Sequence, residues 1–164
     1  MKKLSMLALT AVTALAVPCI TFAAGSGSIK PEKMLNDYDR YAVVYTGEEE
    51  RVYADTESLL RDPMNAGSLP IIRGTLYAEV YRDPLTYPDY GNYDLVKYIL
   101  RYDIAIGADQ IGGQIRYRMQ DDLVGAYDAQ GRPIPAPVLK DSPVDEPDDL
   151  YIALYRLTRD STGF

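Results

Sequence analysis

Residues 93–106 read YDLVKYILRYDIAI, and this stretch decides the fold of the chain. Apolar and charged side chains alternate along it, which is the pattern of a half-buried strand in an antiparallel sheet. The apolar face is expected to hold Val96, Tyr98, Leu100, Tyr102, Ile104 and Ile106. The polar face is expected to hold Lys97, Arg101 and Asp103.

The same period of two continues on both sides of this stretch and predicts further strands. Gly107 is expected to begin a turn that ends at Gly113, and the next strand should place Asp121 among its inward-facing apolar residues, which predicts a bulge or a strand end there. Asp128-Ala129-Gln130-Gly131 is typical of a type I turn closed by a left-handed glycine. The other expected strands cover residues 41–45, 51–55, 71–81, 114–123 and 132–134.

A helix is expected at the end of the chain. Pro147 suits the first turn of a helix, and Leu150, Leu154 and Leu157 follow with helical spacing. These leucines should pack against the sheet face around Val96, Tyr98, Leu100 and Tyr102. The predicted fold class is α+β, a five- or six-stranded antiparallel β-meander with a C-terminal α-helix packed on one face.

The first 24 residues have the form of an export signal. Lys2 and Lys3 precede an apolar run over residues 4–20, and a small-residue cleavage site follows. Pro18 stands directly before Cys19, where a lipidated cysteine needs a small residue. The run is short for a membrane-spanning helix, so no transmembrane segment is expected after cleavage. The sequence therefore predicts a signal peptide at 1–24, a flexible leader at 25–40 with a short helical turn, and a single domain at 41–164.

Composition limits the chemistry that the exported chain could perform. Cleavage would remove Lys2, Lys3 and Cys19 and leave 15 basic against 24 acidic side chains, without His or Trp. The negative charge argues against nucleic acid as a partner. Without thiol or imidazole groups, the chain offers no Cys/His zinc site, no thiol nucleophile and no imidazole base. We expect no cofactor, no metal and no enzymatic activity.

Carboxylates leave one route to chemistry open. Acidic clusters at 48–50, 121–122 and 145–149 do not follow the spacing of a calcium loop. Asp55, Asp83 and Asp89 could serve a hydrolase only as a carboxylate pair at a fixed separation within a cleft. A hydrolase of this kind is the third functional hypothesis.

Arginine and tyrosine side chains form the candidate partner-binding surface. A loop at 82–93 carries Tyr87 and Tyr90 among prolines, where rigid aromatic rings provide contact area, although the loop could instead cap the sheet edge. The sheet face opposite the helix concentrates basic groups, which either bind an acidic partner or a second copy, or form ordinary cross-strand charge pairs. The candidate residues are Arg73, Tyr77, Tyr81, Tyr87, Tyr90, Lys97, Arg101, Arg116 and Arg118.

Several short motifs resemble one family. They are Tyr41-Ala42-Val43-Val44, the octapeptide VYADTESL at 52–59, Tyr102-Asp103-Ile104, Tyr117-Arg118, and YDAQG at 127–131. In their order they resemble the surface-adhesin protein E-like family of bacterial envelope proteins. The chain departs from that family in lacking a Trp near its first strand and cysteines after signal cleavage. The resemblance implies binding of a host or matrix protein at the cell surface, and it assigns no individual residue.

The resulting hypothesis is an exported, adhesin-like binding protein of the periplasm, the outer surface or the medium. Its partner would be a protein, which could be a host or matrix protein, and the basic face would also allow a homodimer. The alternative is a periplasmic accessory or inhibitor protein that docks on an envelope enzyme. Digestion of surface proteins on intact cells would separate these two hypotheses.

Overall fold

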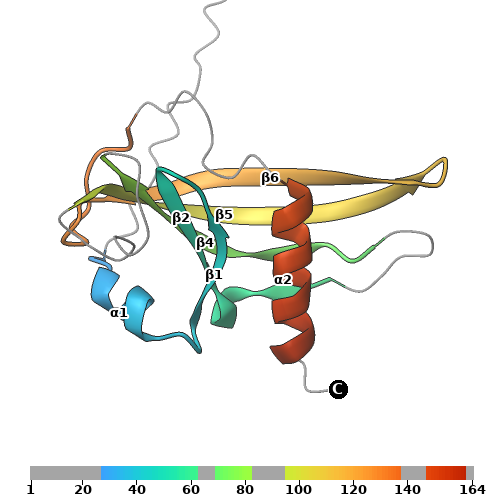
Figure 1. Ribbon diagram of the computed structural model, residues 1–164, viewed down its shortest axis with the longest axis horizontal. Helices are drawn as coiled ribbons and strands as arrows, with labels where there is room; N and C mark the ends of the chain where they lie inside the picture. Colours follow the sequence, from blue (N-terminus) through green and yellow to red (C-terminus); the bar gives the residue numbers. More distant parts are fainter. Residues whose placement is uncertain (1–26, 63–68, 83–94, 138–146, 162–164) are drawn as a thin grey trace, which may run out of the picture.

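The computed structural model describes residues 27–62, 69–82, 95–137 and 147–161 and confirms the predicted fold class. Its strands form one antiparallel sheet in the order β1-β2-β4-β5-β6, and the two-residue β3 pairs with β4 beside this path. Figure 1 shows helix α2 crossing the sheet and helix α1 lying apart from α2. The elements are α1 (Pro31–Asn36), β1 (Tyr41–Thr46), β2 (Glu50–Asp55), the 3₁₀ turn η1 (Thr56–Ser58), β3 (Leu60–Arg61), β4 (Ile72–Tyr81), β5 (Val96–Ile111), β6 (Gln114–Tyr127) and α2 (Pro147–Ser161).

Strands β5 and β6 form a long hairpin that extends beyond the rest of the sheet (Figure 1). The sequence predicted a turn over residues 107–113, but only Gly112 (φ 60°) and Gly113 (φ 82°) turn the chain. Gly107 and Asp109 remain in the ladder, where they pair with Arg118 and Arg116. Turn-forming residue types at 107–111 were outweighed by continuous pairing with β6. The hairpin thus continues past Ile106, which pairs with the first residue of β4.

Two register shifts change which residues share a face. Between β4 and β5, Val80 pairs with Tyr98 and Tyr81 with Val96, so Lys97 is the additional residue of a bulge. This bulge turns Val96 to the face opposite α2, and its predicted place beside Tyr98 was wrong. In β6 the shift lies at Val124, three residues beyond the predicted position.

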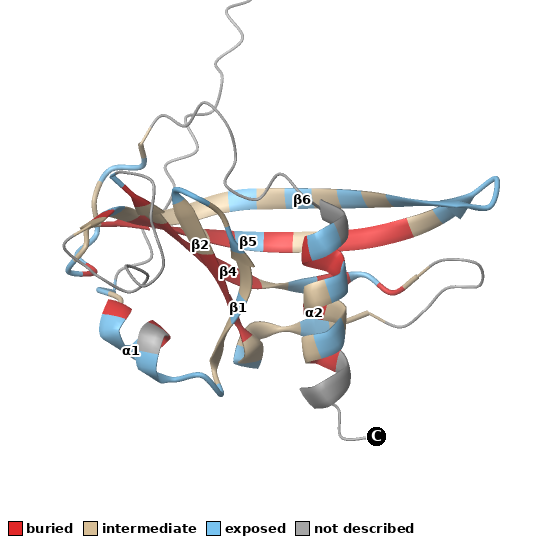
Figure 2. Cartoon of the chain, in the orientation of Figure 1, coloured by how far each residue is buried: buried red, intermediate tan, exposed pale blue. Residues whose placement is uncertain are grey.

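The face beneath α2 holds the larger core. Leu150 and Leu154 are buried there with Leu100, Tyr102 and Ile104, as the helical spacing predicted, while Leu157 is partly buried. Tyr151 anchors the same helix, because its hydroxyl donates a hydrogen bond to the carbonyl oxygen of Pro70 at 2.9 Å. Figure 2 shows the buried side of α2 turned toward the sheet.

The opposite face holds a second core that the sequence did not predict. Met34 of α1 is 2% exposed and packs in this core, so part of the expected flexible leader is a packed helix. The leader is also held at Ile29, whose N–H donates to the carbonyl oxygen of Gly131 at 3.0 Å. The second core consists of Met34, Tyr53, Tyr77, Tyr81, Val96, Ile99 and Tyr127.

The loop that receives the leader has the predicted geometry. Gly131 adopts a left-handed φ of 76° and donates its N–H to the carbonyl oxygen of Asp128 at 2.9 Å. Residue 134 then pairs back, since the N–H of Ile134 donates to the carbonyl oxygen of Ala126. Among the helices in the described ranges, none has the length and apolar content needed to cross a membrane.

Candidate functional site

The exposed end of the face opposite α2 forms a groove of about 230 Å³ between two of the predicted arginines. Arg73 on β4 pairs with Ala105 on β5, and Gly107, two residues further along β5, pairs with Arg118 on β6. Ala105 has a small side chain and Gly107 has none, and the side chain of Ile71 packs close over Gly107. The groove is lined by Ile71, Arg73, Ala105, Gly107, Arg118, Met119 and Gln120. We call this surface the basic groove.

Each arginine of the basic groove already contacts one carboxylate. Arg73 Nε lies 3.0 Å from Asp62 Oδ2, and Arg118 Nη2 lies 2.8 Å from Asp109 Oδ2. The arginine side chains are 52% and 73% exposed, so both ion pairs lie in water. Exposed pairs contribute only about 0–1 kcal/mol, and a guanidinium has five N–H donors. An incoming carboxylate could therefore share or replace these partners at little cost.

The remaining predicted residues do not join this groove. Arg116 is exposed on β6, nearer the hairpin tip, and pairs in register with Asp109. Lys97 is exposed at the bulge of β5, with Nζ 5.4 Å from the centre of the Tyr98 ring. Arg101 is half-buried beside Tyr77.

Two of the four predicted tyrosines are buried and so cannot form part of an exposed binding surface, and the other two are not described. Tyr77 and Tyr81 are 8% and 2% exposed, because they belong to the second core, so the prediction of both at an uncovered surface was wrong. Tyr87 and Tyr90 lie outside the described residues. Period-two alternation assigned Tyr77 and Tyr81 to the correct face but gave no sign of what covers that face.

A buried carboxylate stands at the centre of the second core. Glu79 is 0% exposed, and its Oε2 accepts hydrogen bonds from the hydroxyls of Tyr81 at 2.7 Å and Tyr53 at 3.2 Å. Burial raises the pKa of Glu79, while the two hydroxyl donors and the charge of Arg51 oppose that rise. Burial also raises the pKa of Tyr81, which keeps its hydroxyl protonated as a donor. Since this carboxylate has no exposed surface, its arrangement is that of a structural group.

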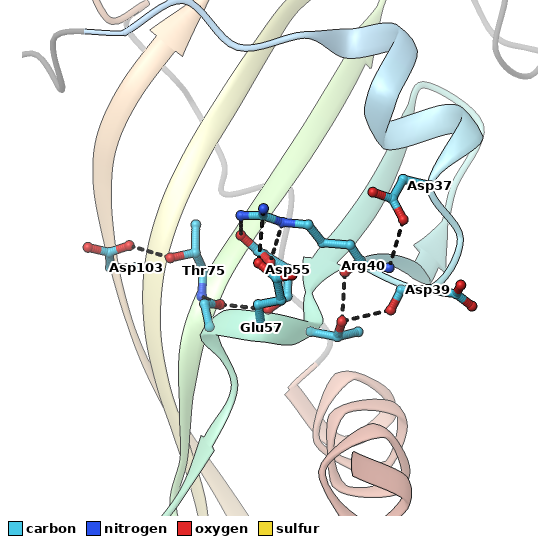
Figure 3. A network of polar contacts seen from close by, with 9 residues as sticks. Asp37, Asp39, Arg40, Asp55, Glu57, Thr75 and Asp103 are labelled. Carbon is cyan, nitrogen blue, oxygen red and sulfur yellow. Dashed lines mark hydrogen bonds and ion pairs between the residues drawn. The ribbon is translucent and has the colours of Figure 1, made fainter.

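Figure 3 shows a polar network that the sequence did not reveal, where β1 begins and β2 ends. Arg40 donates from Nε and Nη2 to both oxygens of Asp55, at 3.1 and 3.0 Å, and its Nη1 lies 2.9 Å from Glu57 Oε2. The hydroxyl of Ser58 accepts the N–H of Thr75 at 2.8 Å and so ties η1 to β4. These bonds fix the VYADTESL segment where β2 ends and η1 begins, which gives its polar residues a structural role.

Metal and carboxylate chemistry has little support in the residues that the structure describes. Within those ranges, no group of three or more His, Cys, Asp or Glu residues is placed to hold a metal ion. Asp83 and Asp89, two members of the carboxylate hypothesis, lie outside the described residues, and Asp55 is engaged by Arg40. The basic groove offers charged donors for recognition of an anionic group.

Comparison with known proteins adds no relative: no family model, no curated protein and no solved structure matches the chain. The function must therefore be argued from the surface itself.

Proposed function

We propose that this is an exported cell-envelope protein that binds an acidic protein partner through the basic groove. The observation that carries the proposal is the placement of Arg73 and Arg118 on either side of Ala105 and Gly107. A carboxylate side chain of a partner could enter between two guanidinium groups that are held by different strands. Arginine suits this task because its planar fork binds carboxylates with two parallel hydrogen bonds.

The net negative charge of the chain favours specific binding of an acidic partner at the basic groove over nonspecific electrostatic attraction. Acidic side chains outnumber basic ones by 24 to 17, so an acidic partner would be repelled from most of the surface. A local basic groove on such a protein therefore favours one orientation of the partner. Arginine is also enriched at protein interfaces, where it combines charge with contact area.

The location of the partner divides the proposal into two forms. In the adhesin-like form, the partner is a host or matrix protein outside the cell. In the accessory form, it is an envelope enzyme in the periplasm. Protease added to intact cells separates them, because degradation of the protein supports surface exposure and protection supports the periplasm.

The groove itself can be tested with a simple acidic probe. Poly-L-glutamate should bind the immobilised exported protein, and Arg73→Glu with Arg118→Glu should reduce its affinity by about tenfold or more, the effect of removing a close charge pair or two. The matched control is Lys97→Glu with Arg132→Glu, which makes the same change in net charge outside the groove. Equal losses of affinity in both double variants would show that poly-L-glutamate responds only to the net charge of the protein, and this would contradict the proposal.

A further inference from the structure

The floor of the basic groove is bordered on both sides by side chains of the neighbouring strands, at two successive levels of the sheet. One row consists of Arg73, Ala105 and Gln120, and the next consists of Ile71, Gly107 and Arg118. Residues two apart in a strand are separated by about 7 Å, which is therefore the spacing of the rows. The arginines lie on one diagonal of the groove, and an aliphatic and an amide side chain lie on the other.

Apolar surface adjoins Arg73 on two sides. Ile71 directly precedes β4, and because Ile72 is buried in the larger core, alternation places Ile71 on the opposite face, with Arg73. Ile71 packs close over Gly107 and is still 37% exposed. On the outer side, Leu60 of β3 pairs with Arg73 and is 64% exposed.

These two aliphatic side chains form one apolar patch beside the charged groups. Leu60 and Ile71 are diagonal neighbours across β3 and β4, and side chains at such positions can reach each other. Single exposed apolar residues are ordinary, whereas contiguous apolar surface with a polar border is typical of an interaction site. A ligand that offered only a carboxylate to the arginines would leave this patch in water.

The spacing of the rows matches the repeat of an extended chain. An extended segment presents every second side chain on one face, about 7 Å apart. When one of its carboxylates lies between Arg73 and Arg118, the side chain two residues away can lie over Ile71. Gln120 is exposed and offers both a donor and an acceptor to the backbone of such a segment.

We propose that the groove binds an extended protein segment in which an acidic residue and a large apolar residue are two positions apart. This inference rests on the proposed function, because it names the ligand of the same groove. The apolar residue packs on Ile71 and Leu60 and removes their exposed surface from water. It also excludes water from the carboxylate, which strengthens the attraction between the carboxylate and the guanidinium groups.

An anionic lipid also combines negative charge with apolar chains, but it fits the molecule less well. Acidic side chains outnumber basic ones by 24 to 17, so an anionic membrane would repel most of the surface. A protein segment meets less repulsion, because only the residue at the groove has to carry a negative charge. The observations therefore favour a protein segment over a membrane.

Two repeat peptides of identical composition and charge test the spacing. Extended Glu-Ser-Leu-Ser repeats present Glu and Leu on the same face, whereas Glu-Leu-Ser-Ser repeats present them on opposite faces. The exported protein should bind the first peptide about fivefold or more tightly than the second, because only the first can bury its Leu on Ile71. Fluorescence anisotropy with labelled peptides measures both affinities. Equal affinities for the wild type would overturn the inference.

A pair of double variants assigns the preference to the patch. Leu60→Ser with Ile71→Ser should bring the two affinities together. The matched control is Ile115→Ser with Ile152→Ser, which removes two exposed apolar side chains on the α2 side and should keep the preference. Thermal unfolding of each variant confirms that it is folded. A preference that survives in Leu60→Ser with Ile71→Ser would overturn the inference.

The arginine variant distinguishes this inference from the proposed function. Arg73→Glu with Arg118→Glu should weaken the binding of both peptides and of poly-L-glutamate. If it does so while the wild type binds both peptides equally, the proposed function stands and this inference fails. If it changes no affinity, both fail. Vesicles of phosphatidylglycerol and phosphatidylcholine test the lipid. Vesicle binding that needs Leu60 and Ile71, without a peptide preference, would replace the protein segment by a membrane and overturn the inference.

Discussion

The two faces of one sheet are built in different ways. The face beneath α2 is covered by a long helix, and its buried residues are mainly aliphatic. The opposite face is divided: its inner part is a tyrosine-rich core that includes Met34 of the six-residue α1, and its outer part is the basic groove. Both faces follow the same alternation of side chains. The difference shows that alternation identifies residues on a common face, while coverage depends on elements far away in the sequence.

The largest effect should come from the α2 face. Leu154 is 0% exposed in the larger core, and Leu154→Ala should lower the free energy of unfolding by about 2–5 kcal/mol through lost burial and a new cavity. Denaturant unfolding measures the change. Ile152→Ala on the same helix is the control, because Ile152 is 40% exposed and should change stability by less than about 0.5 kcal/mol. Equal effects at both positions would mean that α2 does not pack through Leu154.

The second core should respond to the loss of Met34. Met34→Ala should lower the free energy of unfolding by about 2 kcal/mol, at the low end for a buried methionine, because α1 is short and can settle into part of the space. Lys33→Ala, at an exposed position of α1, provides the comparison. If the two variants have the same stability in chemical denaturation, α1 contributes nothing to the second core and the two faces differ less than the structure indicates.

Glu79 should make the second core sensitive to pH. Burial raises the pKa of Glu79 in the folded chain above its ordinary value, so folding is favoured when the carboxyl is protonated. The contribution is fully present below the pKa of the unfolded chain and is lost as the pH rises through the folded pKa. Glu79→Gln removes this dependence. The stability of the variant relative to wild type should therefore increase with pH across that window and level off above it.

Unfolding midpoints of wild type and Glu79→Gln over a pH series would measure this difference. The groups that face Glu79 are Tyr53, Tyr81 and Arg51. Tyr81 remains protonated over the same range, since burial raises its pKa. Glu49→Gln, at an exposed position, should show no such trend. A constant difference between Glu79→Gln and wild type at every pH would contradict a raised pKa.

The sequence was sufficient to predict the strands and α2 because their patterns are local. Alternation from Tyr98 to Ile106 and leucine spacing in α2 are both confirmed by the structure. Val96 was assigned to the wrong face because the bulge at Lys97 depends on pairing with β4. The prediction that this strand ends before Gly107 was wrong for a similar reason. Pairing with the partner strand decides whether the chain turns at a glycine or continues as a strand.

The candidate site was only partly predictable. Arg73 and Arg118 were chosen from period-two alternation, and register then placed them across Ala105 and Gly107. Tyr77 and Tyr81 were chosen by the same rule but are buried, because the covering helix contributes a single methionine that no periodic pattern marks. The Arg40–Asp55 pair joins the residue that precedes β1 to the last residue of β2, and neither residue stands out in its own segment.

The smallest effect on stability should come from the basic groove. This result would separate the groove from the second core, which lies on the same face of the sheet. Arg118 is 73% exposed, so a double-mutant cycle of Arg118→Ala and Asp109→Ala should give a coupling energy below about 0.5 kcal/mol. The comparison cycle uses Arg40→Ala and Asp55→Ala, where the carboxylate side chain is only 8% exposed and its coupling should be larger. Denaturant unfolding at low and high salt measures both, and salt should weaken only the exposed pair. A large coupling at Arg118 would mean that the pair stabilises the hairpin and is not available to a partner. A negligible coupling energy would show that the pair of Arg118 with Asp109 does not stabilise the fold. Arg118 would then be available to a partner, as the proposed binding role requires.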